Sequence, residues 1–248
     1  MPEEIVLLPT HVDGLDRILG GGIPAGSTVL VAGPPGTFKT SLVYRVMHAN
    51  AERHGRKGLY LTLEQTADSL LTQAARLGLD GLPESSLYVI DLPQLRRSRP
   101  ETEGQKDWVS IVKLLIEEGV RASGYETVAI DSLQGLLALA PVASPRREIF
   151  HFVASLKEHA VTTFLIGETP FGSPSLGQWG EDFLADGILY LHPAEVGDAQ
   201  VQLRLRTVKM RWMNHDHGAF ALNFDGERFS LSKVIARRGE ETPWSVVR

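Results

Sequence analysis

Residues 33–40 have the types and spacing of a phosphate-binding loop. They read Gly-Pro-Pro-Gly-Thr-Phe-Lys-Thr. An apolar run at 28–32, typical of a buried strand, leads into them, and a helical pattern over 39–54 follows. Together these features match Gly-x-x-x-x-Gly-Lys-Ser/Thr, with Phe38 in place of the second glycine. We therefore expect a P-loop between a strand and a helix.

Each part of such a loop has a chemical task. Glycines let backbone N–H groups close around a phosphate, and the positive end of the following helix faces the same anion. Lys39 is expected to reach the β- and γ-phosphates of ATP, and the Thr40 hydroxyl to bind Mg²⁺. The expected nucleotide contacts in this segment are Gly33, Pro34, Pro35, Gly36, Thr37, Phe38, Lys39, Thr40 and Ser41.

Phe38 leaves two conformations open. A positive φ at this position would cost roughly 1–2 kcal/mol for a phenylalanine. A negative φ would be tolerated and would let the ring cover the phosphates. The affinity for nucleotide depends on which of these is adopted.

Two carboxylates follow strands of the expected core. Asp131 ends an apolar strand at 127–131, where an acid faces the ligand crevice of a parallel sheet and can hold Mg²⁺, as in the Walker B motif. Glu64 follows a strand at 58–62 and could orient or deprotonate the attacking water. A helix-start acid is the equally reasonable alternative for Glu64.

Basic residues and histidines gather late in the chain. Lys209 and Arg211 alternate on one face of an expected strand edge, where they could neutralise phosphate charge or only discourage aggregation. From the residues alone the second interpretation is favoured. His215 and His217 alternate in the same way, but no third ligand is obvious, so a metal site is not expected there.

The alternation of strands and helices predicts an α/β fold. Further helices are expected over 67–77, 107–121 and 146–159, further strands over 87–90 and 161–166, and a solvated loop over 95–105. This order implies a mostly parallel sheet flanked by helices. From about residue 187 the segments 188–191, 201–208, 220–224 and 229–234 alternate like antiparallel strands, and Asp225-Gly226 predicts a hairpin turn.

Composition sets the class of protein. The chain has 248 residues, which suffices for one large domain, expected over 1–236, with a tail over 237–248. The absence of cysteine rules out disulfides and thiolate chemistry. No apolar run reaches membrane-spanning length and no secretory signal opens the chain, so a cytoplasmic protein without membrane contact is expected. A net charge of −5 argues against a general nucleic-acid coat but leaves a local basic patch open.

The chain as a whole resembles a single KaiC-type domain of the RecA-like ATPases. The resemblance covers about residues 8–230. It is carried by the stretch 14–27 before the P-loop, Glu64-Gln65-Thr66, Asp131-Ser132-Leu133, Arg146-Arg147-Glu148-Ile149-Phe150, the segment 162–168, and Lys209-Met210-Arg211 with His215. It implies a RecA-like P-loop NTPase core and a member of the circadian clock protein family, although one domain does not imply a clock role.

The resemblance also implies roles for individual residues. The family forms rings, usually hexamers, with ATP between subunits. By resemblance, Glu64 becomes the water-activating base, Lys209 and Arg211 act on the γ-phosphate of a neighbouring subunit, and His215 faces the neighbour's nucleotide. The expected function is that of a Mg-dependent ATP hydrolase with a regulatory or signalling role and a possible protein partner.

Departures from the family pattern qualify these implications. Gln65 replaces a second family glutamate, which predicts slow turnover, and with Phe38 it leaves open a nucleotide-gated scaffold that hardly hydrolyses ATP. Asp182-Phe183 stands where the autophosphorylating type has neighbouring Ser and Thr, so the hydrolytic type is expected.

A DNA-binding repair ATPase of the RecA/RadA type is the other alternative. The segments 132–145 and 169–186, expected to be central loops that line a ring channel, contain no Lys or Arg. DNA is therefore disfavoured, because phosphate contact needs cations. Phe171 and Trp179 could stack on bases, but packing at subunit contacts is the commoner role of loop aromatics.

Overall fold

The computed structural model describes residues 5–98, 108–139, 144–173, 175–197 and 200–234. The expected tail at 237–248 lies outside the described residues, as does most of the expected loop at 95–105. The elements are, in chain order, β1 (Leu7–Leu8), α1 (Leu15–Ile18), β2 (Ile23–Pro24), β3 (Thr28–Gly33), α2 (Lys39–His54), β4 (Gly58–Thr62), α3 (Ala67–Arg76), β5 (Leu87–Asp91), α4 (Leu92–Arg97), α5 (Trp108–Ser123), β6 (Thr127–Asp131), α6 (Leu133–Leu139), α7 (Pro145–Glu158), β7 (Thr162–Glu168), α8 (Glu181–Leu184), β8 (Gly187–Val196), β9 (Gln200–Met210), β10 (Ala219–Phe224) and β11 (Phe229–Lys233).

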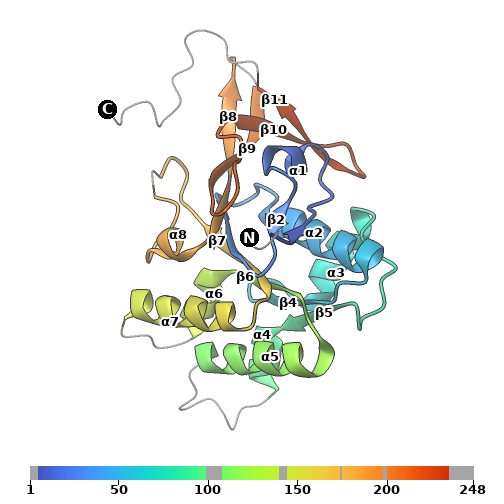
Figure 1. Ribbon diagram of the computed structural model, residues 1–248, viewed down its shortest axis with the longest axis vertical. Helices are drawn as coiled ribbons and strands as arrows, with labels where there is room; N and C mark the ends of the chain where they lie inside the picture. Colours follow the sequence, from blue (N-terminus) through green and yellow to red (C-terminus); the bar gives the residue numbers. More distant parts are fainter. Residues whose placement is uncertain (1–4, 99–107, 140–143, 174, 198–199, 235–248) are drawn as a thin grey trace.

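A large mixed sheet organises the fold. Its strand order is β11-β10-β9-β8-β3-β7-β6-β4-β5. Neighbouring strands in the part β8-β3-β7-β6-β4-β5 pair in parallel. Neighbouring strands in the part β11-β10-β9-β8 pair antiparallel. The predicted α/β class, with a mostly parallel sheet and an antiparallel C-terminal part, is thus confirmed (Figure 1). Among the described residues no helix combines the length and apolar character needed to cross a bilayer.

Helices cover both faces of β3, β4, β6 and β7, so every residue of these four strands except the last of β7 is buried. Successive side chains of β3 point to opposite faces. Val29 and Val31 pack with α1, α2 and α3, whereas Leu30 and Ala32 pack with α5, α6 and α7. In Figure 1, α2 and α3 accordingly lie apart from α5 and α7. Two apolar cores therefore fix the sheet from either side.

The carboxyl ends of the parallel strands meet at one edge. Gly33 at the end of β3 pairs with Glu168 at the end of β7, and Asp131 at the end of β6 pairs with Thr62 at the end of β4. Gly33 approaches β8 so closely that a Cβ there would lie 2.2 Å from the Leu191 carbonyl oxygen. The P-loop therefore begins at the edge where the other strand ends present their polar groups.

Two expectations about local structure are wrong. Residues 92–97 form α4, capped by the Asp91 carboxylate, which accepts from the Gln94 N–H, so the expected loop begins later than 95. Residues 133–139 form α6 with buried leucines, so the segment 132–145 is not simply a loop. β9 lies between β8 and β10, but its pairing with β10 covers only residues 204–206, so the expected strand edge at Lys209 is confirmed.

Candidate nucleotide-binding site

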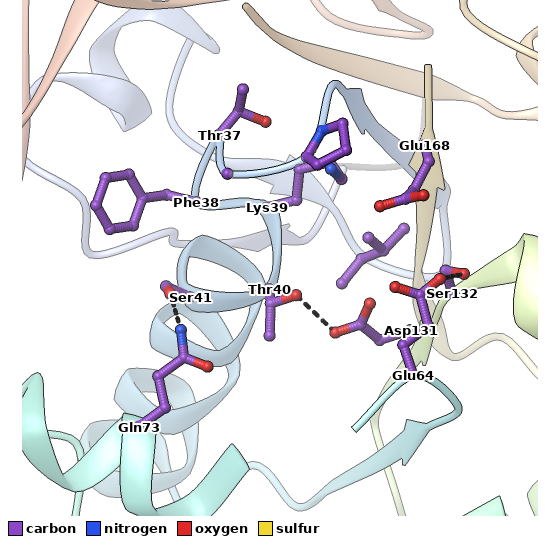
Figure 2. Close-up of a pocket in the computed structure, with 13 residues that line it drawn as sticks. Thr37, Phe38, Lys39, Thr40, Ser41, Glu64, Gln73, Asp131, Ser132 and Glu168 are labelled. Carbon is purple, nitrogen blue, oxygen red and sulfur yellow. Dashed lines mark hydrogen bonds between the residues drawn. The ribbon is translucent and has the colours of Figure 1, made fainter. Parts of the chain in front are cut away.

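A pocket of about 320 Å³ opens beside the P-loop. Its lining comes from the loop, the first turn of α2 and the ends of β6 and β7, together with residues after β4 and on α3 (Figure 2). The lining residues are Pro35, Gly36, Thr37, Phe38, Lys39, Thr40, Ser41, Glu64, Gln73, Asp131, Ser132, Ile166 and Glu168. Sequence positions from four parts of the chain thus converge on one cavity.

Lys39 is folded back over its own loop. Its Nζ donates to the Pro34 carbonyl oxygen over 2.9 Å, and Thr37 Oγ1 donates to the same oxygen over 2.8 Å. Burial lowers the pKa of Lys39, against the opposing charges of Glu168, Asp131 and Glu64. A phosphate in the pocket would replace the carbonyl with a charged acceptor, which makes the stronger hydrogen bond.

Thr40 and Asp131 are joined directly. Thr40 Oγ1 donates to Asp131 Oδ2 over 2.8 Å, and the buried Tyr60 hydroxyl donates to the same oxygen over 2.7 Å. Burial, helped by the charge of Glu64, raises the pKa of Asp131, and these two hydrogen bonds oppose the shift. A hydroxyl and a carboxylate of raised pKa are oxygen ligands suited to Mg²⁺, whose charge would favour the ionised acid.

Glu64 is held by the residue after Asp131. The Ser132 hydroxyl donates to Glu64 Oε1, and Ser132 Oγ accepts from the Gly135 N–H over 3.1 Å. The N-cap of α3 is Thr66, whose side chain accepts from Ser69 N, so Glu64 does not cap that helix. The carboxylate instead lines the pocket with Asp131, where it could orient a water molecule.

Glu168 is a pocket residue that the sequence analysis did not select. Its N–H donates to Gln134 Oε1, and Gln134 Nε2 donates to its carbonyl oxygen, both over 3.1 Å, so α6 fixes its backbone. The sequence contains a pattern that could have indicated Glu168, because this residue ends an apolar strand just as Asp131 does. Figure 2 shows its side chain directed into the pocket near Lys39.

Phe38 adopts the left-handed conformation, with φ 63°. Of the two open conformations the positive one is therefore present, at a cost of roughly 1–2 kcal/mol. Its ring does not cover the loop but contacts the hairpin of β10 and β11, with centroid distances of 6.1 Å to Phe224 and 5.7 Å to Phe229. Aromatic pairs contribute about 0.5–1.5 kcal/mol each, enough to offset the strain.

Lys209, Arg211 and His215 do not line this pocket. Lys209 Nζ donates to the carbonyl oxygens of Asp182, Phe183 and Ala185 at the end of α8, the last over 2.6 Å. Burial and the neighbouring Arg211 charge lower the pKa of Lys209.

Arg211 is tied to the same part of the chain. Its Nη1 and Lys157 Nζ both bond Oδ1 of the buried Asp186, over 3.0 and 2.7 Å. The expectation that Lys209 and Arg211 share a face is thus confirmed, since both reach the same segment.

His215 is half-buried beside His217, with ring centroids 4.4 Å apart. Burial, and to a smaller degree the neighbouring His217, lowers the pKa of His215. Within the described residues no group of three or more His, Asp or Glu side chains could hold a metal ion. The histidine pair therefore has no further ligand in the described part of this chain.

The strand order and the pocket define a P-loop nucleotide-binding protein with a RecA-like core. The family described as "ATPase: KaiC" matches residues 8–227. The chain is 30% identical over 242 residues to the circadian clock oscillator protein KaiC 1 of Synechocystis sp., covering 92% of this chain and 44% of that protein. It is 27% identical over 241 residues to the circadian clock oscillator protein KaiC of Picosynechococcus sp., covering 92% and 45%.

The fold is similar to a solved structure. The crystal structure of a KaiC-like protein from the hyperthermophilic archaeon Pyrococcus horikoshii superposes with a TM-score of 0.79 and 24% identity, covering 92% of this chain and all of that one. This chain belongs to the KaiC ATPase family. It spans less than half the length of the two clock proteins that it matches.

Proposed function

We propose that this chain binds ATP with Mg²⁺ and hydrolyses it to ADP and phosphate. The observation that carries the proposal is the presence of Lys39, Thr40, Asp131 and Glu64 in one pocket. Lys39 offers a positive charge to the β- and γ-phosphates, and the N-terminus of α2 offers unpaired N–H groups to the same anion. The family membership of the chain supports the same activity.

Thr40 and Asp131 are the residues that would hold the magnesium ion. Within the described part of the chain both hydrogen bonds to the Asp131 carboxylate fall on Oδ2. When bound, Mg²⁺ would supply charge neutralisation at the β- and γ-phosphates. Three carboxylates, Glu64, Asp131 and Glu168, surround the single lysine of the pocket, so nucleotide binding without a divalent cation is expected to be weak.

Glu64 is proposed as the base that orients and polarises the attacking water. The Gly135 N–H occupies a lone pair of Ser132 Oγ, which directs the Ser132 proton toward Glu64. This contact limits the rotation of the carboxylate. Gln65 turns away, since Ser69 donates to its side-chain oxygen, and it offers no second carboxylate. Slow turnover is therefore proposed.

A ring, with a hexamer as the proposed form, would bring Lys209, Arg211 and His215 to the nucleotide of a neighbouring subunit. The family membership supports this arrangement, as do the exposed aromatic side chains of Phe183 and Trp212 beside the two cations. Lys209 would exchange the carbonyl oxygens of α8 for γ-phosphate oxygens. Contact with a neighbour is thus proposed to move α8.

A cytoplasmic regulatory or signalling role, with a protein partner that reads the nucleotide state, is the proposed setting. Two observations bear on the alternatives. The described parts of 132–145 and 169–186 present no Lys or Arg, which disfavours DNA. The strained Phe38 and the Gln65 substitution favour a nucleotide-gated scaffold as the second candidate.

Phosphate release from ATP tests the activity. We expect release by the wild-type chain with Mg²⁺, loss of release with EDTA, and loss of both ATP binding and release in Lys39→Ala. A rate of phosphate release that is unchanged by EDTA and by Lys39→Ala would overturn the proposal. Tight ATP binding with release at background would leave the scaffold as the better description.

A further inference from the structure

The ring of Phe38 lies at one end of the pocket and is open to solvent. Phe38 is 41% exposed as a residue, whereas Phe229 beneath it is 3% exposed. Phe229 meets the Phe38 ring at an interplanar angle of 73°, and Phe224 packs on Phe229 with centroids 4.7 Å apart. The three rings form an aromatic cluster, Phe38-Phe224-Phe229, that joins the P-loop to the β10–β11 hairpin.

The pocket has two chemically different ends. Glu64, Ser132 and Glu168 lie at one end, and Figure 2 shows Phe38 and Gln73 at the opposite end, across Lys39 and Thr40. A nucleotide whose γ-phosphate points toward Glu64 must direct its ribose and base away from the carboxylates. The base then lies at the end formed by Phe38 and Gln73.

The backbone strain at Phe38 bears on ligand binding at the Phe38 end of the pocket. Strained residues persist where the surroundings hold them, and they concentrate at ligand sites. The positive φ turns the ring out of the phosphate loop and onto the hairpin, which fixes its orientation. A rigid, half-exposed aromatic ring beside a polar pocket is a surface on which a nucleobase can stack.

We propose that Phe38, supported by Phe224 and Phe229, is the stacking platform for the base of the bound nucleotide and favours purines over pyrimidines. This inference rests on the proposed function. The preference follows because a two-ring purine is larger and more polarisable than a pyrimidine and stacks more strongly on an aromatic ring. The position thus contributes to base recognition although the motif normally has glycine there.

Equilibrium binding tests the platform with three ligands, each with Mg²⁺: ATP, CTP and inorganic tripolyphosphate, which has no base. Phe38→Leu is expected to weaken ATP binding about tenfold, within the range measured for base–aromatic stacking, and to reduce the ATP-to-CTP preference. Tripolyphosphate binding is expected to change less than about twofold, because the phosphate contacts remain. Phe38→Tyr keeps the ring and is expected to retain wild-type selectivity.

Phe171→Leu is the matched control, since Phe171 is an exposed phenylalanine that does not line the pocket. Equal weakening of ATP and tripolyphosphate in Phe38→Leu would overturn the inference and leave the ring as a structural anchor of the hairpin. Unchanged ATP binding would overturn it as well. Wild-type protein that binds neither ATP nor tripolyphosphate would instead refute the proposed function, so the two failures are distinguishable.

Discussion

Thr40 Oγ1 donates a 2.8 Å hydrogen bond to Asp131 Oδ2, joining the first turn of α2 to the end of β6. Thr40 and Asp131 are the two residues that would hold a magnesium ion. The carboxylate is buried next to Glu64, and its raised pKa records the unfavourable environment of the charge. The buried charge of Asp131 therefore lowers the stability of the folded chain at the position proposed to bind the metal ion.

Asp131→Asn is expected to stabilise the nucleotide-free protein. An acid whose pKa is raised by folding binds its proton more tightly in the folded state, so its charged form lowers the free energy of unfolding at neutral pH. Asparagine keeps an oxygen for Thr40 and Tyr60 without the charge. Thermal melting should show a gain of about 2–4 °C, the size of roughly 1 kcal/mol for this length. Asp68→Asn, an exposed acid, should show no gain, and a lower melting temperature for Asp131→Asn would contradict the account.

Ser132→Ala is expected to impair catalysis more than binding. The substitution removes the donor that holds Glu64 and leaves the Gly135 N–H without its acceptor. We expect kcat to fall about tenfold with KM for ATP nearly unchanged, and stability to fall by about 1 kcal/mol.

Steady-state kinetics and urea unfolding check this. Ser155→Ala is the control, because its hydroxyl donates to the Phe152 carbonyl within α7, away from the pocket. An increase in KM with unchanged kcat would show that Ser132 does not position the base.

Asp186 is expected to be a determinant of stability near the proposed subunit contact. Its Oδ1 accepts from Lys157 and Arg211, and its Oδ2 accepts from the Thr28 N–H over 3.1 Å. Asp186→Ala should lower the free energy of unfolding by about 2 kcal/mol. This is less than the loss expected when one partner of a fully buried ion pair is removed, because both cations here can regain water. Urea unfolding measures it, and Asp186→Asn should be milder, since it preserves an acceptor for Thr28.

The stability of the protein is expected to fall in mild acid. Burial lowers the pKa of His11, His48, His192 and His215. Below the ordinary value of 6.5 the unfolded chain takes up protons that the folded chain does not, so the free energy of unfolding decreases as pH falls.

His48, buried in α2 with Nε2 at 3.2 Å from the Asp80 carbonyl oxygen, isolates this effect. His48→Gln should lose part of the stability change between about pH 7.5 and about pH 5.5. The comparison variant is His151→Gln, which replaces an exposed histidine. The raised pKa of Asp131 makes the protein more stable as pH falls, but this contribution is the same in both variants and cancels in the comparison. Identical pH slopes for the two variants would refute the assignment.

Much of the parallel core could be predicted from the sequence. α2, β4 and β6 have the predicted bounds. The two strands were recognised because continuous apolar runs mark buried strands, and the end of α2 was recognised because Gly55 follows its last turn. The short helix α6 was missed, since the glycine-containing run 133–139 has too few turns to show a helical period.

Other features depend on contacts distant in sequence. The conformation of Phe38 is set with the hairpin at 224–229, which no local pattern reports. The pocket position of Glu168 follows from its register opposite Gly33. The carbonyl contacts of Lys209 require α8, a helix too short for its pattern to be recognised.

The central claim is that Glu64 activates water for ATP hydrolysis in this pocket. The most direct measurement compares ATP binding and phosphate release in wild type and Glu64→Gln under the same conditions with Mg²⁺. The account predicts that Glu64→Gln binds ATP within about threefold of wild type and that its release rate falls about 100-fold or more, the range for loss of a general base. Equal release by the two proteins would contradict it.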